Sequence, residues 1–310
     1  MTFIERGRGA WELLRQTFAD WSEDKAPQLG ASLAFYTALS IAPLLVILLG
    51  VAAFFFGDDA AGGHIVHELR SLVGDEGAKA IEQMIASANK PTTGTIATVL
   101  SVATLLFGAS GVFGQLQSAL NTIWEVKPKP GRGVWGFLRD RFLSFAMVMG
   151  IAFLLIVSLV VTAALAAVSN LWSGLAESAA WLAQGLNLCV SLGLLTMLFA
   201  MTFKLLPDVK MAWSDVWLGG FITAALFVIG KFAIGLYLGH SSMASSYGVA
   251  GSFVVLLVWV YYSAQILFFG AELTQVYANK FGSWIVPDDH AEPLTEGERA
   301  QQGRPRRKPR

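Results

Sequence analysis

The chain has 310 residues, of which 55% are hydrophobic and 14% are charged. Soluble globular domains carry about 25% charged residues, so this composition excludes an ordinary soluble protein. The 22 basic residues balance the 22 acidic ones, so the net charge by itself indicates neither a nucleic-acid partner nor an acidic substrate.

The first predicted element is an amphipathic helix near the N-terminus. Four apolar residues, Trp11, Leu14, Phe18 and Trp21, recur at helical spacing, with charged residues elsewhere on the wheel. Two interpretations fit this pattern. The helix lies in the cytoplasmic membrane interface, or it packs on the membrane bundle itself.

Long stretches without charge define the rest of the architecture. Residues 26–57, 91–124, 142–176 and 178–203 contain no Asp, Glu, Lys or Arg, and 216–271 is interrupted only by Lys231. A bilayer core of about 30 Å needs about 20 apolar residues in a helix, and the fifth stretch is long enough for two spans. We therefore predict an all-α polytopic membrane protein with six transmembrane helices, at about 31–56, 95–120, 142–168, 181–206, 216–238 and 249–277.

The distribution of Lys and Arg predicts the orientation of these spans. With both termini on the cytoplasmic side, 18 of the 22 basic residues fall inside and Lys231 falls within the membrane. Only Arg70, Lys79 and Lys90 then lie outside. Cytoplasmic loops are enriched in Lys and Arg, so both termini are predicted to be cytoplasmic.

The segments outside the spans complete the predicted domain organisation. Residues 58–94 carry two short amphipathic patterns, which predict an outer helical hairpin between spans 1 and 2. Residues 1–280 are thus predicted to form a single membrane domain. Residues 281–310 are rich in Pro, Gly and charge, which predicts a disordered cytoplasmic tail.

Polar residues inside the predicted spans are the candidate functional residues, because such groups are costly in a bilayer. A first stripe of Ser32, Tyr36 and Ser40 precedes Pro43, which is predicted to kink the first helix. A second set contains Gln115 and Asn121, near the cytoplasmic end of the second span.

The sixth predicted span carries the third set, on one helical face. Tyr261, Gln265 and Glu272 follow each other at spacings of four and seven residues. Lys231, in the fifth span, is expected to lie about 20 Å from Glu272 in depth, so the two charges are not expected to pair. All three sets either hold helices together by hydrogen bonds or line a cavity that faces the cytoplasm.

Chemical motifs for catalysis are absent from the sequence. It contains no His-rich metal motif, no Gly-x-Ser-x-Gly elbow and no Walker lysine loop. We therefore expect no metal, no cofactor and no enzymatic activity. The glycine sets Gly108/Gly111/Gly114 and Gly235/Gly239 are predicted to mark close helix packing rather than a hinge.

Two parts of the chain resemble a known family. The first is the segment Gly30–Ser40, with the sequence GASLAFYTALS, followed by Pro43. The second is a set of blocks at Leu206–Val209, Gly235–Leu238, Tyr247–Gly248, Trp259–Ile266 and Phe269–Glu272. Together they resemble the YihY/BrkB family of bacterial membrane proteins over roughly residues 10–280.

This resemblance implies an inner-membrane protein with a six-helix core. Ser32, Tyr36, Gln265 and Glu272 coincide with polar signature positions of that family. The family has carried a ribonuclease BN label and a virulence association, and some relatives are linked to export of lipid-linked envelope precursors. The resemblance does not imply one settled activity.

The leading hypothesis is a non-enzymatic inner-membrane protein that handles or transports an amphipathic envelope molecule such as an anionic lipid. Its expected partners are membrane lipids, with no nucleic acid. A second hypothesis is a structural protein that recruits envelope proteins through the 58–94 hairpin. A ribonuclease with a basic tail as its RNA contact is the third.

Overall fold

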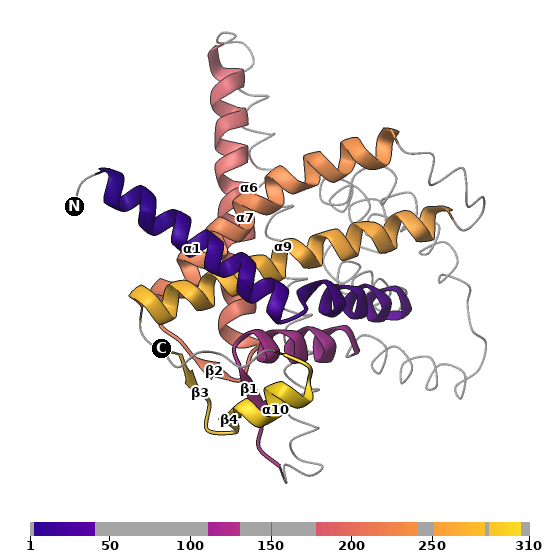
Figure 1. Ribbon diagram of the computed structural model, residues 1–310. Helices are drawn as coiled ribbons and strands as arrows, with labels where there is room; N and C mark the ends of the chain where they lie inside the picture. The colour runs from indigo at the N-terminus through magenta and orange to yellow at the C-terminus, as the bar shows by residue number, and fades with distance from the viewer. Residues whose placement is uncertain are drawn as a thin grey trace.

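The computed structural model of the chain describes residues 3–40, 111–130, 150, 178–240, 251–282 and 285–304. Within these residues the chain is mostly helical, with seven helices and four short strands (Figure 1). The helices are α1 (Phe3–Glu23), segments 26–40 and 111–123, α6 (Ser178–Leu205), α7 (Trp213–His240), α9 (Gly251–Phe281) and α10 (Glu296–Gln301). The strands are β1 (Val126–Pro128), β2 (Val209–Lys210), β3 (Val286–Pro287) and β4 (Ala291–Pro293).

The last three predicted spans coincide with long apolar helices. The stretches Leu188–Leu205, Trp213–Tyr237 and Phe253–Phe281 are long and apolar enough to cross a bilayer. They belong to α6, α7 and α9, where the charge-free stretches predicted spans. The first and second predicted spans are described in part, as the helical segments 26–40 and 111–123. The third predicted span, the hairpin 58–94 and Pro43 lie outside the described residues, apart from position 150.

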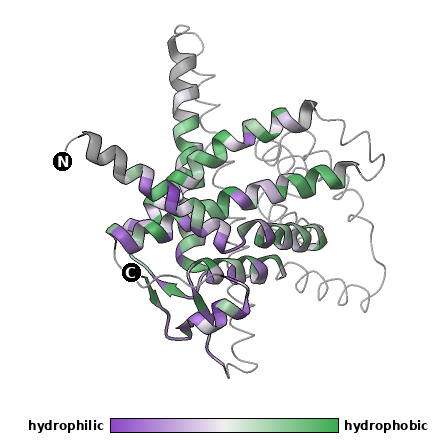
Figure 2. Cartoon of the chain, viewed as in Figure 1, coloured by the Kyte–Doolittle hydropathy of each residue, from purple (hydrophilic) through white to green (hydrophobic). Residues whose placement is uncertain are grey.

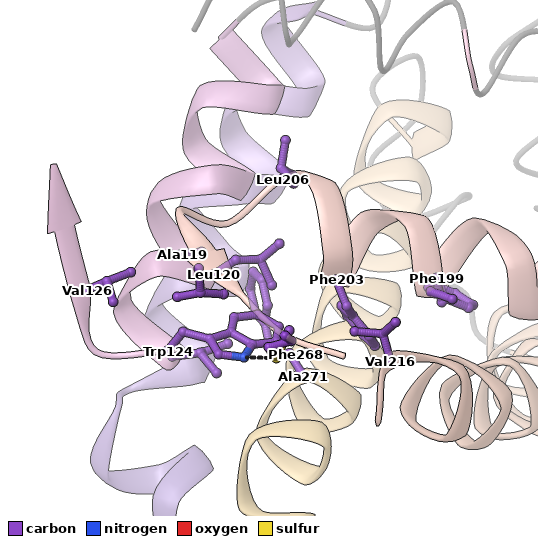
Figure 3. Packing of buried hydrophobic residues seen from close by; sticks show 14 of the residues in the cluster. Ala119, Leu120, Trp124, Val126, Phe199, Phe203, Leu206, Val216, Phe268 and Ala271 are labelled. Carbon is purple, nitrogen blue, oxygen red and sulfur yellow. Dashed lines mark hydrogen bonds between the residues drawn. The ribbon is translucent and has the colours of Figure 1, made fainter. Parts of the chain in front are cut away.

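The described core forms where the helices meet near one end of the bundle. Leu120, Phe203, Val216 and Phe268 come from four different helices and are buried against one another (Figure 3). Trp124 closes this cluster, and its indole N–H donates to the Met211 sulfur at 3.2 Å. Because the indole nitrogen has a partner, Trp124 can be buried without an unsatisfied donor.

Helices α7 and α9 pack closely through two matching Gly–Thr pairs. A β-carbon at Gly219 would overlap the Thr274 side chain, and a β-carbon at Gly270 would overlap the Thr223 side chain. Each threonine hydroxyl donates 2.7 Å back to the carbonyl of the glycine on its own helix, four residues earlier. Small residues therefore allow these backbones to approach, as in many membrane helix pairs.

The glycines that the sequence predicted for this role behave differently. Among the described residues, a β-carbon at Gly114 or Gly235 would meet no atom within 4 Å, so the structure shows no close packing at these two glycines there. Gly111 makes only ordinary contacts, at 3.5 Å or more. Gly108 and Gly239 cannot be compared, because no contact of either glycine is described.

Large apolar side chains cover the outward faces of the long helices. On α7, Phe221, Ile229, Phe232 and Leu236 are all exposed. Figure 2 shows that hydrophobic residues predominate along α7 and α9, whereas hydrophilic residues are concentrated toward the strands and α10. An exposed apolar surface of this extent is typical of helices that contact lipid rather than water.

Most of the predicted apolar stripe of α1 is exposed, whereas its last residue, Trp21, is half-buried and packs against the core cluster. Trp11 is 71% exposed and Phe18 is 61% exposed, while Thr17 and Asp20 on another face are buried. Helix α1 contacts α9. The face with Thr17 and Asp20 and the end of the stripe at Trp21 therefore lie toward the bundle, while Trp11 and Phe18 point away from it.

The C-terminal segment corrects the prediction of a disordered tail. Residues 285–304, here called the C-terminal cap, contain β3, β4 and α10. Strand β4 pairs antiparallel with β1, and β3 pairs antiparallel with β2. Helix α10 begins at Thr295, which forms a capping box with Glu298. The content of proline and charge predicted disorder, but in this unit the prolines lie in the strands and charged side chains form ion pairs.

The prolines of the cap occupy strand positions that tolerate them. Backbone bonds join Leu294 N to Glu125 O at 2.8 Å and Asp288 N to Asp208 O at 2.9 Å. Hydrogen-bonded pairs alternate with non-hydrogen-bonded pairs in antiparallel ladders, which places Pro287 and Pro293 at non-hydrogen-bonded positions. Proline lacks an N–H, so it removes no ladder bond there.

Candidate functional site

The candidate site is a polar face on α9, inside an otherwise apolar helix. Glu272 is fully buried, and its neighbour one turn further on, Gln275, is buried as well. The Gln275 amide donates 2.7 Å to the carbonyl of Ile123, which ties α9 to the end of helix 111–123. An ionisable residue buried at such a position is expensive and marks a candidate functional site.

Gln265 lies against the backbone of helix 26–40. A β-carbon at Gly30 would overlap the Gln265 amide nitrogen and lie 3.3 Å from its Cδ. Gly30 therefore permits a close approach that any other residue would prevent. Both polar atoms of the Gln265 amide are buried, and neither has a hydrogen-bond partner in the described part of the chain.

The Gln265 amide, buried and without a hydrogen-bond partner among the described residues, is a specific chemical feature. Leaving a buried polar group unsatisfied costs about 1–3 kcal/mol. Any molecule that offers a hydroxyl, phosphate or carbonyl oxygen to the Gln265 amide would recover part of this cost. Gln265 can donate and accept at the same point, which suits a polar headgroup with both kinds of atom.

The first predicted stripe divides between two environments. A β-carbon at Gly111 would lie 3.5 Å from Tyr36 Cδ1 and 3.7 Å from Ser40 Oγ, so both side chains reach helix 111–123. Ser40 is buried there, whereas Tyr36 is partly exposed and Ser32 is exposed. The stripe therefore does not form one buried polar row.

Asn121 forms part of a helix junction. Its Nδ2 donates 3.0 Å to Asp208 Oδ2, and its Oδ1 accepts from Asp208 N at 2.8 Å. Both residues are buried, and Gln117 lies 3.5 Å from the same carboxylate. Asn121 thus fastens the turn after α6 to helix 111–123, while Gln115 is half-buried on the same helix.

Lys231 and Glu272 lie at different levels of the α7–α9 pair. Glu272 falls between Gly270, which meets Thr223 of α7, and Thr274, which meets Gly219 of α7. Lys231 follows Gly230, which meets Tyr262 and Ile266 of α9. Glu272 is thus level with about position 221 of α7, ten residues before Lys231, so at 1.5 Å per helical residue the two levels are about 15 Å apart, less than the depth difference expected from the sequence. The Lys231 ammonium lies 5.6 Å from the Phe232 ring centroid.

Tyr261, the other predicted residue of α9, is 37% exposed, four residues before Gln265. Sequence reasoning missed Gly30, Gln275 and the two Gly–Thr pairs. The repeated spacing of a glycine and a threonine four residues apart was the signal that could have found those pairs. No group of three or more His, Cys, Asp or Glu that could hold a metal occurs among the described residues.

Charged side chains gather in the C-terminal cap. Lys127 of β1 binds Glu292 at 3.0 Å and also binds Glu298 of α10. The hydrogen bond from Lys127, helped by Thr295, lowers the pKa of Glu298 from 4.5 to about 2. The same contacts with Glu298 and Glu292 raise the pKa of Lys127. This end of the molecule is therefore polar and ion-paired.

Long apolar helices with an exposed apolar surface, a buried carboxylate and a charged cap at one end define an integral membrane protein. The profile of the virulence factor BrkB family matches residues 17–295. The chain belongs to this family, as its sequence motifs predicted.

Curated relatives carry the same general description. A UPF0761 membrane protein of Vibrio vulnificus strain YJ016 is 27% identical over 286 residues, which cover 87% of this chain and 83% of the relative. One from Psychromonas ingrahamii is 30% identical and covers 78% of this chain and 79% of its own length. One from Cronobacter sakazakii is 27% identical, with 86% and 87% covered. No solved structure matches the chain.

Proposed function

We propose that this membrane protein moves or handles an amphipathic molecule of the envelope, such as an anionic lipid, without catalysing a reaction on it. The observation that carries the proposal is the fully buried Glu272 in α9, a helix long and apolar enough to span a bilayer. Ionisable groups at such positions commonly serve substrate or proton pathways. The buried amide of Gln265 on the same helix supports a pathway for a polar headgroup.

The polar residues would act in different ways along this pathway. Gln265 would exchange hydrogen bonds with headgroup oxygens, and Ser40 and Tyr36 would offer hydroxyls beside helix 111–123. Lys231, at another level of α7, would attract the anionic group. Glu272 would repel an anion while ionised and accept it when protonated, which couples passage to proton uptake.

The membrane arrangement follows from the same proposal. Six spans with both termini in the cytoplasm of a bacterial inner membrane would place the C-terminal cap on the cytoplasmic side. The excess of Lys and Arg in the loops on that side supports this orientation.

Helix α1 would lie in the cytoplasmic interface of the membrane. Its exposed residues Trp11, Leu14 and Phe18 form one apolar stripe, and the Glu12 carboxylate on another face pairs with Lys280 of α9 at 2.8 Å. An amphipathic helix held to the bundle by its polar side can bury the apolar stripe among lipid headgroups and acyl chains.

The proposal is tested with purified full-length protein in vesicles that contain fluorescent phosphatidylglycerol or phosphatidylcholine. Dithionite bleaches only the outer leaflet, so movement between leaflets is seen as extra bleaching. We expect the wild type to move the anionic lipid faster than the zwitterionic one. Glu272→Gln and Gln265→Leu should reduce this movement at least tenfold. Glu296→Gln makes the same chemical change on the exposed surface of α10 and should leave the rate unchanged.

Two results would contradict the proposal. The wild type moves neither lipid, with or without a pH gradient, or both site variants match Glu296→Gln. The interpretation as a recruiting protein would then be favoured, and deletion of residues 58–94, which lie outside the described residues, would test it. Metal-dependent RNA cleavage by highly purified protein would revive the nuclease hypothesis.

A further inference from the structure

We propose that the C-terminal cap, residues 285–304, is a detachable latch that ties three turns of the bundle together and opens as one unit. The cap bridges parts of the chain that are far apart in sequence but meet at one end of the molecule (Figure 1).

The first turn joined by the cap lies between α1 and helix 26–40. Arg304 Nε donates 3.0 Å to Asp24 Oδ1, and Arg299 lies 3.8 Å from the same oxygen. Asp24, Arg299 and Arg304 are all buried. Lys25 also donates 2.9 Å to the carbonyl of Gln302. The cap therefore contacts the turn between α1 and helix 26–40 through two successive residues, Asp24 and Lys25.

The second turn follows helix 111–123, and the third lies between α6 and α7. Glu125 of the second turn binds Arg299, and its carbonyl accepts from Leu294. At the third turn Lys210 pairs with Asp289 at 2.7 Å, and strand β2 pairs with β3. The second and third turns are thus each held by backbone hydrogen bonds and by a charged side chain.

The chemistry of these contacts suits reversible detachment. Ala291 of the cap belongs to the buried apolar core cluster, and Ile285 packs against that cluster. The other contacts described above are hydrogen bonds and ion pairs. Charged groups that leave a buried pair regain their hydration, so the net energy of such a pair is small compared with its Coulomb attraction. A unit held mainly in this way can open without exposing much apolar surface.

Two turn residues link cap docking to backbone conformation. Lys25 and Glu125 are the non-glycine residues with a positive φ in the described chain, at 55° and 58°. Each lies two residues after a helix end, and each contacts the cap. Left-handed conformations are costly for residues with a β-carbon, so cap contacts help to hold both turns, and release of the cap lets them relax.

The reporter for opening is a single cysteine at position 291, made in a Cys189→Ser background because Cys189 is exposed. Ala291 is buried in the docked cap, so the Ala291→Cys thiol reacts with a maleimide only when the cap detaches. We expect Asp24→Asn to raise the labelling rate at least tenfold, because both cap arginines lose a carboxylate. Glu296→Gln, on the exposed face of α10, should leave the rate unchanged.

A disulfide provides the opposite test. Lys210 and Val286 are Cα partners in the β2–β3 ladder, a spacing that suits a disulfide. Oxidised Lys210→Cys/Val286→Cys should slow labelling of position 291 at least tenfold relative to the same oxidant on the reporter alone. The disulfide joins β3 to β2 and does not contact β4, which carries position 291. Slower labelling would therefore mean that β3 and β4 detach together.

Labelling at high salt tests the latch without a substitution at Asp24, in case Asp24→Asn does not fold. In 1 M NaCl the reporter in the otherwise wild-type chain should label several-fold faster, because salt weakens the partly exposed pairs. A cysteine at the fully buried Ala224 of α7 should be unaffected. The latch is refuted if neither Asp24→Asn nor salt speeds labelling, or if the disulfide fails to slow it.

An effect of the latch on lipid movement rests on the proposed function. If that function holds, the oxidised Lys210→Cys/Val286→Cys protein should move lipid several-fold more slowly, and a reductant should restore the rate. The labelling experiment needs no lipid transport. A latch that opens in a protein without transport would therefore refute the proposed function alone.

Discussion

Arg304 and Asp24 lie 280 positions apart in the chain, yet Arg304 Nε donates a 3.0 Å hydrogen bond to Asp24 Oδ1 within a buried pair. This bond joins the turn after α1 to the last described residue. The cap can dock in this way only after the helices between these residues have brought the turns together. The Arg304–Asp24 contact therefore forms only when the bundle between these residues has assembled.

Truncation tests whether the C-terminal segment is structural. Removing residues 285–310 takes away Arg299 and Arg304, which pair with Asp24, together with the β1–β4 and β2–β3 strand pairs. We expect a clearly lower thermal unfolding midpoint in detergent, measured by tryptophan fluorescence. A shorter deletion of residues 305–310 serves as control and should retain the midpoint. Equal midpoints for both deletions would show that the cap adds no stability.

Gly30 tests the close contact with Gln265. Gly30→Ala should lower the unfolding free energy by about 1–3 kcal/mol, because its β-carbon overlaps the amide. Gly114→Ala, with nothing within 4 Å among the described residues, should be neutral or slightly stabilising. The double variant Gly30→Ala/Gln265→Ala should recover much of the loss. Failure of this rescue would mean that the overlap with Gln265 is not the cause.

Asn121 and Gln115 belong to one predicted polar set, but we expect substitutions at the two positions to differ in their effect on stability. Asn121→Leu removes a donor and an acceptor from buried Asp208 and should cost about 1–3 kcal/mol in chemical or thermal unfolding. Gln115→Leu is the matched change on the same helix and should have little effect on stability. Equal losses in the two variants would contradict a specific role for the Asn121–Asp208 contact.

The pKa of Glu298 predicts how the cap responds to acid. Its folded-state pKa of about 2 is below the ordinary 4.5, so its contribution is complete above pH 4.5 and is lost as the pH falls towards 2. A fluorophore attached at neutral pH to Ala300→Cys, in Cys189→Ser, would follow this loss by its anisotropy.

A variant of the partner lysine sharpens this experiment. Lys127→Gln removes the main cause of the lowered pKa, so the acid transition should move up towards pH 4.5. Glu296→Gln should leave the transition where it is. If Lys127→Gln and the wild type share one midpoint, Glu298 does not control the acid response.

The sequence predicted well the elements that neighbouring residues determine, and it predicted poorly the contacts between residues distant in the chain. Helices α6, α7 and α9 agree with the predicted spans 181–206, 216–238 and 249–277 to within a few residues, because long charge-free stretches determine them locally.

The failures concern contacts between distant residues. Composition predicted a disordered tail because it could not show that Arg299 and Arg304 meet Asp24. Periodicity grouped Ser32 with Ser40, although only Ser40 faces a neighbouring helix closely enough to be buried. Which helix covers which face is decided by packing, and a single sequence does not contain that pairing in readable form.

The depth of α1 in the membrane can be measured with spin labels at two positions of equal chemistry. Leu14→Cys and Ala19→Cys, each in Cys189→Ser, place a label at exposed sites on different faces of α1. If the stripe of Trp11, Leu14 and Phe18 enters the lipid, the label at 14 relaxes mainly with oxygen, which concentrates in the bilayer. The label at 19 then relaxes mainly with a water-soluble nickel complex. Because both sites are exposed in the protein itself, any difference between them comes from the surroundings. Equal accessibility to the nickel complex would place α1 in water and contradict its interfacial position.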